Sequence, residues 1–121
     1  MSTSLWAGVL AIGGVGSVVR FVVDRAVARR VTDALPLGTL TVNVSGAFLL
    51  GLLTGVAPGP TVSLLAGTAF LGAYTTFSTW MLETDRLAEE RQIRGAVANI
   101  ALSVVLGLSA AGFGLWLGGL Q

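Results

Sequence analysis

Cysteine, histidine and lysine are all absent from the 121 residues, and only 11% of the residues are charged. Without cysteine the chain can form no disulfide and has no thiol nucleophile, and without histidine it lacks a common transition-metal ligand. Soluble domains average about 25% charged residues. A composition that is 54% hydrophobic therefore predicts a membrane protein. It also argues against an enzyme, since no acid/base or nucleophile constellation is evident.

Charged residues are confined to positions 20–94, and most of them fall in two patches. The first patch is Asp24, Arg25, Arg29, Arg30 and Asp33, and the second is Glu83, Asp85, Arg86, Glu89, Glu90, Arg91 and Arg94. Between the patches lie 49 consecutive uncharged residues, enough for two spans of about 20 residues each. The Pro58-Gly59-Pro60 segment supplies the turn between them.

The uncharged stretches before and after the patches each hold one further span. The sequence thus predicts an all-α membrane protein, a single domain over residues 1–121, with four transmembrane helices. We place these helices near residues 4–23, 36–57, 61–82 and 94–118. The first could instead be a secretory signal, because Ala26-Val27-Ala28 resembles a cleavage site, but no basic residue precedes the apolar run.

Small residues predict which helices touch, because helices in lipid associate by close backbone approach. Gly51 and Gly55 in the second span are four residues apart, as are Gly114 and Gly118 in the fourth. We therefore expect these glycines to mark helix contacts. A second stripe in the fourth span, Asn99, Ser103, Gly107 and Ala111, is expected to face inward. Glycine is also simply frequent in membrane helices, which accounts for single glycines but not for Asn99 one turn before Ser103.

The third span contains the polar and aromatic run Gly72-Ala73-Tyr74-Thr75-Thr76-Phe77-Ser78-Thr79-Trp80. Polar side chains and loose backbone are costly in lipid, so such a run is tolerated only where it faces protein, water or a ligand. Its clustered hydroxyls compete for backbone hydrogen bonds and favour a local break in the helix. The run is therefore a candidate pore.

Other polar groups in the spans are mainly hydrogen-bond donors. They are Asn43, Asn99, Ser103 and, near one end of the first span, Arg20. With no carboxylate inside a span, these groups suit a small anion. The alternatives are an interhelical hydrogen bond for Asn43, snorkelling to the headgroups for Arg20, and simple packing for Phe77 and Trp80.

Three motifs together resemble the Fluc (CrcB) fluoride channels in order and spacing, across essentially the whole chain. They are Gly13-Gly14-Val15-Gly16-Ser17-Val18-Val19-Arg20-Phe21, then Pro36-Leu37-Gly38-Thr39-Leu40-Thr41-Val42-Asn43-Val44-Ser45-Gly46, and then residues 72–80 with Glu83. The resemblance implies an antiparallel, dual-topology-type dimer of four-helix subunits with a broken third helix. It implies passive fluoride export across the bacterial cytoplasmic membrane, which reduces fluoride toxicity, with fluoride, membrane lipid and a second chain as partners and no nucleic acid.

The same resemblance implies roles for individual residues. Pore contacts to fluoride would come from Asn43, Phe77, Ser78, Thr79, Trp80, Asn99 and Ser103. Arg20 would match the arginine of the first span, as a vestibule or structural charge. The carbonyls of Gly72 and Thr75 would hold a structural Na⁺ ion at the dimer centre. Trp80 departs from the family, which usually has a second Phe at this position.

The arginines also bear on orientation, because six of them flank the spans on one side and none on the other. The positive-inside rule then predicts a fixed topology with both termini outside the cytoplasm. A chain of fixed topology would be one half of a heterodimer, whereas dual insertion would give a homodimer, and both remain open. The rivals from other classes are a small proton-coupled multidrug exporter, which needs a carboxylate within the membrane, and a non-conducting regulatory subunit.

Overall fold

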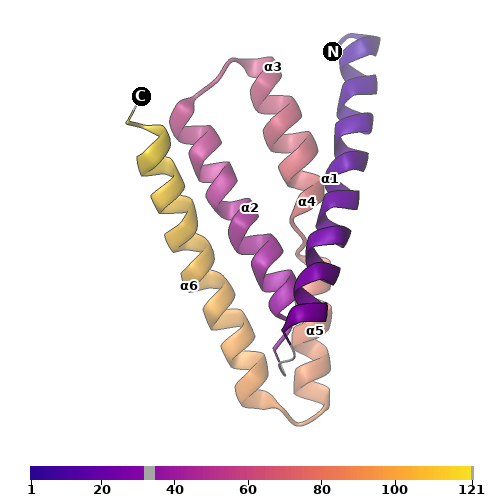
Figure 1. Cartoon of the computed structure of the whole chain (residues 1–121), viewed down its shortest axis with the longest axis vertical. Coiled ribbons are helices and arrows are strands. Elements are labelled where there is room, and N and C mark those ends of the chain that lie inside the picture. Colours follow the sequence, from indigo (N-terminus) through magenta and orange to yellow (C-terminus); the bar gives the residue numbers. More distant parts are fainter. Residues whose placement is uncertain (32–34, 121) are drawn as a thin grey trace.

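The computed structural model describes residues 1–31 and 35–120, and the regular secondary structure of these residues is entirely helical. The elements are α1 (Thr3–Arg30), α2 (Leu37–Val56), α3 (Pro60–Val62), the π-helix η1 (Ser63–Leu71), α4 (Gly72–Tyr74), α5 (Ser78–Glu89) and α6 (Ile93–Gly118). Figure 1 shows long helices that run up and down along the molecule. The prediction of an all-α fold is confirmed for the described residues.

Three of these helices, α1, α2 and α6, are long and apolar enough to cross a membrane. The third predicted span is not one continuous helix. Helix α3, η1 and α4 follow one another without interruption, residues 75–77 are not helical, and α5 then continues in roughly the same direction. The break therefore lies within the polar and aromatic run in which the sequence predicts it.

Helix α1 extends to Arg30, seven residues beyond the predicted end of the first span. The first charged patch therefore lies on a helix rather than in a loop, except for Asp33, which is outside the described residues. Arg29 and Arg30 stand in the last turn of α1, where positive charge is favourable because the helix dipole is negative there. Charged residues end a membrane span but not a helix, and this explains the longer element.

Helices α2 and α6 pack backbone against backbone along the predicted glycine faces. A Cβ atom at Gly51 would collide with the carbonyl oxygen of Ala111, and one at Gly114 with the carbonyl of Phe48. At Gly118 the Cβ would lie 2.5 Å from the carbonyl oxygen of Leu52. The prediction that these glycines mark helix contacts is confirmed, and the structure adds that the two glycine faces pack on each other, which fixes α6 beside α2.

The two ends of the molecule differ in charge. Both termini and the turn between α2 and α3 lie at one end (Figure 1), and that end has no charged side chain in the described residues. The C-terminal end of α1 and the turn between α5 and α6 lie at the other end, with the arginines of both patches.

The turn between α5 and α6 has a defined geometry. Arg91 adopts a left-handed conformation, with φ 61°, and Gln92 N–H donates to the Leu87 carbonyl at 2.8 Å. This is the Schellman arrangement that ends many helices.

Candidate functional site: a groove beside the helix break

The break after α4 begins at Thr75, whose backbone is extended (φ −80°, ψ 161°). The next residue, Thr76, loses its helical partners and bonds instead to the side chain of Asn43 on α2. Thr76 N–H donates to Asn43 Oδ1 at 2.9 Å, and Asn43 Nδ2 donates to the Thr76 carbonyl at 2.8 Å. One amide side chain thus satisfies both the N–H and the carbonyl of Thr76, two of the backbone groups that the break frees.

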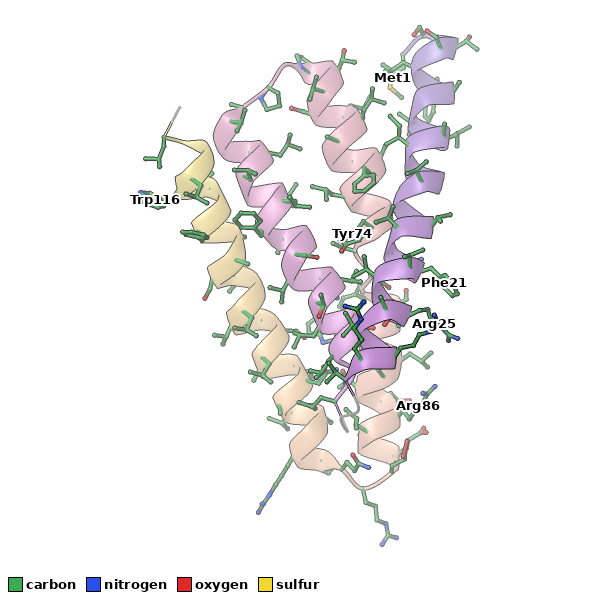
Figure 2. The ribbon with its side chains drawn as sticks, in the orientation of Figure 1. Met1, Phe21, Arg25, Tyr74, Arg86 and Trp116 are labelled. Carbon is green, nitrogen blue, oxygen red and sulfur yellow. The ribbon has the colours of Figure 1, made fainter. Side chains whose placement is uncertain are left out.

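Further contacts hold the broken segment. Thr76 Oγ1 accepts a hydrogen bond from Thr79 N–H at 3.1 Å, so the threonine caps the start of α5. Just before the break, the Tyr74 hydroxyl bonds Ser45 on α2 at 2.9 Å. Figure 2 shows Tyr74 in the middle of the molecule, whereas Phe21 and Trp116 project outward. Gly46 on α2 lies so close to Thr75 that a Cβ there would collide with the threonine methyl group.

A groove of about 1020 Å³ runs along α2, η1, α4 and α6 and reaches the break. Four of the predicted pore residues line it, namely Asn43, Phe77, Trp80 and Ser103. Gly72 and Thr75, the predicted cation ligands, line it as well. None of the groove's lining residues is charged. The groove therefore offers hydroxyl, amide and aromatic groups to a ligand and no carboxylate.

The two predicted aromatic residues are in contact at the groove. The Phe77 and Trp80 rings lie 5.8 Å apart at 83°, an edge-to-face pair, and Phe77 is 69% exposed. Large exposed aromatic rings often mark a surface that contacts another molecule or a ligand. Both rings line the groove together with Asn43, and in the edge-to-face pair the electropositive edge of one ring points at the face of the other.

The remaining predicted pore residues do not line the groove. Ser78 is exposed and Thr79 is half-buried on α5. Arg20, the predicted vestibule or structural charge, is half-buried on α1 and does not line the groove either. Asn99 is only 3% exposed and donates through Nδ2 to Thr84 Oγ1 at 2.9 Å. Within one chain the structure therefore brings together four of the seven predicted pore residues.

Thr84 is a residue that the sequence reasoning missed. Its hydroxyl accepts from Asn99 and donates to the Trp80 carbonyl at 2.8 Å, and its side chain is 8% exposed. The four-residue spacing from Trp80 is the usual geometry by which a threonine bonds back along its own helix. That spacing was the available signal, but only the register of α5 against α6 identifies Asn99 as the second partner.

Backbone oxygens at the break also matter, because a hard cation prefers oxygen ligands. Among the described residues no hydrogen bond is donated to the carbonyl oxygens of Gly72 or Thr75. The helical donor for Gly72 would be Thr76 N–H, which is engaged by Asn43 instead. The carbonyl oxygens of Gly72 and Thr75 are ligands of the kind that a hard cation such as Na⁺ prefers.

A smaller cavity of about 270 Å³ lies at the charged end, lined by Asp24, Gly38, Glu83 and five other residues. Glu83 lies beyond the predicted end of the third span, and its Oε1 atom is buried without a hydrogen-bond partner among the described residues. Burial raises the pKa of the Glu83 carboxyl; the nearby Thr39 hydroxyl lowers it, and the Asp24 carboxylate raises it. This cavity is separate from the residues of the groove.

Comparison with known proteins shows the family of the chain. Residues 7–115 match the family model described as CrcB-like protein, Camphor Resistance (CrcB). "Fluoride-specific ion channel FluC 2" of Mycobacterium tuberculosis (strain ATCC 25618 / H37Rv) is 61% identical over 117 residues, covering 97% of this chain and 93% of the relative. FluC 2 of Mycolicibacterium paratuberculosis is 66% identical over 113 residues, 93% of each protein. FluC 1 of Leifsonia xyli subsp. xyli is 47% identical over 112 residues, 89% of this chain and 82% of the relative. The chain therefore belongs to the CrcB family.

Proposed function

We propose that this chain forms a fluoride-specific ion channel in the bacterial cytoplasmic membrane, which lets fluoride leave the cell passively and so reduces its toxicity. Two lines support the proposal. Relatives at 61% and 66% identity are named fluoride-specific ion channels. The structural observation that supports it is the groove beside the helix break, which Asn43, Trp80 and Ser103 all line and which no charged side chain lines.

The chemistry of the groove suits fluoride. A small, strongly hydrated anion needs short hydrogen-bond donors to replace its water shell, and the groove is lined by amide, hydroxyl and aromatic side chains. A proton-coupled exporter would need a carboxylate in the pathway. Glu83 lies at the other cavity, so the groove argues against that rival.

The same groove supports the proposal of a second chain. It is open along the face where Phe77 and many apolar side chains are exposed, and exposed ring edges of one chain would complete a path with donors of another. We propose an oppositely oriented second copy or a homologous chain as this partner. The arginines at one end of the molecule favour a fixed orientation with both termini outside, and hence a heterodimer.

A structural Na⁺ ion at the centre of this dimer is part of the proposal. The carbonyls of Gly72 and Thr75 would hold it, because both are free of hydrogen bonds among the described residues. A cation there would stabilise the broken helix and offset part of the electrostatic cost of a nearby anion. Its role would be structural.

Fluoride efflux from liposomes tests the function. Vesicles loaded with fluoride are assayed with a fluoride electrode, with the chain alone and with a co-expressed homologous chain, and chloride efflux is the comparison. We expect fast fluoride release and slow chloride release in at least one preparation. Vesicles that retain fluoride in both preparations would contradict the proposed function.

Orientation needs a separate measurement. A reporter that is active only in the cytoplasm, fused to the C-terminus, should stay silent if both termini lie outside. A mixed signal from the chain expressed alone would instead indicate dual insertion and a homodimer. Efflux from the chain alone, paired with a silent reporter, would show that conduction does not need an inverted partner.

A further inference from the structure

The outer face of α1 is an uncovered apolar surface. Helix α1 packs on α2, η1 and α4, and Figure 1 shows it at the edge of the molecule. Four large side chains of the outer face are 57–73% exposed, namely Leu10, Val18, Phe21 and Val22. No residue of α1 lines the groove, so a second chain seated at the groove leaves this face to lipid.

Toward the C-terminal end of α1 the same face becomes cationic. Arg25 and Arg29 follow Phe21 at intervals of four residues, and all three side chains are exposed, so they form one stripe along the helix. Arg25 lies nineteen positions after Trp6, which is more than half exposed near the other end of α1. This separation is about 28 Å of helix, close to the hydrocarbon thickness of about 30 Å. With Trp6 at one interface, Arg25 therefore lies at the level of the lipid headgroups of the other.

The two arginines of the stripe have no counter-ion within the chain. Neither Arg25 nor Arg29 forms an ion pair with any residue that the structure describes. The neighbouring Asp24 is half-buried and faces α2 instead, where a Cβ at Gly38 would collide with its carboxylate. The acidic residues of α5 lie on a helix against which α1 does not pack. The positive charge of the stripe is therefore available to a ligand.

Phe21 positions one of the two guanidinium groups. Arg25 Cζ lies 5.7 Å from the centroid of the Phe21 ring, a cation–π contact, and Figure 2 shows both side chains on the same outer side of the molecule. A guanidinium that is already held at the helix surface loses less freedom when it binds. Its planar fork of N–H groups matches the two oxygens of a phosphate.

We propose that Arg25 and Arg29 bind the phosphate of an anionic phospholipid, whose acyl chains lie along the apolar part of the outer face of α1. Each requirement of such a ligand has its place on this helix, with cations at headgroup level and Val18, Phe21 and Val22 at the level of the chains. Anionic headgroups attract basic side chains near the membrane surface. A zwitterionic headgroup carries no net charge, so the stripe selects the anionic lipid.

Native mass spectrometry of the full-length chain in detergent, with any partner chain that co-purifies, measures lipid binding directly. Dioleoylphosphatidylglycerol and dioleoylphosphatidylcholine share their acyl chains and differ in net charge, and we expect the first to bind at least tenfold more tightly. The R25Q/R29Q variant should lose this preference, by about fivefold for each arginine. The matched control is R94Q, which removes an exposed arginine at the same end, on a helix that does not pack on α1, and it should bind as the unmodified chain does.

Several results would overturn the site. Equal affinity for the two lipids would show that the stripe does not select charge. An equal loss in R94Q would show that the whole charged end attracts lipid, and displacement of the lipid by inorganic phosphate at equal concentration would make the ligand a soluble anion. If R25Q/R29Q does not fold, R25Q and R29Q singly carry the same test. The measurement contains no fluoride, so its failure would leave the proposed function standing.

Discussion

The seam between α2 and α6 and the break between α4 and α5 solve the same membrane problem in opposite ways. In the seam, glycines such as Gly51 and Gly114 let the two backbones touch, and every helical hydrogen bond stays inside its own helix. At the break, helical bonds are given up and replaced by the side chain of Asn43. The seam depends on residues that have no side chain, whereas the break depends on the side chain of Asn43.

This difference separates support from function. A contact of backbone on backbone has no room for a ligand and little freedom to move, so it positions α6 rigidly. A break leaves carbonyls and hydroxyls near a groove, where each one must be matched by a side chain, an ion or water. The polar groups of the candidate site therefore gather beside the break, and the seam holds the helix that carries Ser103.

Gly114→Ala should break the seam and have the largest effect on stability. The added methyl group would collide with the backbone of Phe48 and Leu52 on α2, and overpacking of this kind costs about 3 kcal/mol. Thermal unfolding in detergent measures the loss. Gly112→Ala on the same helix is the matched control, because nothing lies within 4 Å of its added Cβ. Equal unfolding midpoints for the two variants would show that the seam can relax.

Asn43→Ala should damage the break and leave the seam intact. It removes the partners of both Thr76 backbone groups, which costs about 2 kcal/mol. We also expect fluoride efflux to fall at least tenfold. Thr41→Val, an exposed threonine of α2 that bonds only its own helix, is the control. Normal flux and stability in Asn43→Ala would contradict the bracing role of the amide.

Much of the difference between the seam and the break could be predicted from the sequence. The gap of uncharged residues between the patches marks the spans, because charge is excluded from lipid wherever it falls in the chain. The cluster of hydroxyls at 75–79 predicts the break, because its competition with the backbone is local. The glycine faces of α2 and α6 are likewise read from i, i+4 spacing alone.

What could not be predicted depends on how separate helices are placed. Asn43 was expected in the pore, and its bonds to Thr76 also give it a bracing role that needs the position of α2 against the break. Asn99 and Thr84 become partners only through the register of α5 and α6. The π-helix η1 has no signal in composition. Ser78 and Thr79 lie outside the groove of the single chain, so their predicted contact with fluoride stays a prediction.

Removal of sodium should weaken the break without affecting the seam. If the carbonyls of Gly72 and Thr75 hold Na⁺, the bound ion stabilises the folded state by about 1.4 kcal/mol at ten times its dissociation constant. Exchange of Na⁺ for N-methyl-D-glucamine should lower the unfolding midpoint, and added Na⁺ should restore it in a saturable way. Gly114→Ala should keep this dependence on sodium. A midpoint independent of sodium at constant ionic strength would remove the cation from the proposal.

The smallest expected effect is the pH dependence of the folding stability that comes from Glu83 on α5. The uncharged seam between α2 and α6 gives no such dependence. Burial raises the pKa of Glu83 above its ordinary value of 4.5, so the folded state holds this proton more tightly than the unfolded state does. Stability from this group is complete below about pH 4.5 and is lost as the pH rises through the folded-state pKa. Glu83→Gln should flatten this part of the pH profile of thermal unfolding. Glu89→Gln, an exposed residue of the same helix, should leave the slope unchanged, and an identical slope in Glu83→Gln would mean that another group titrates.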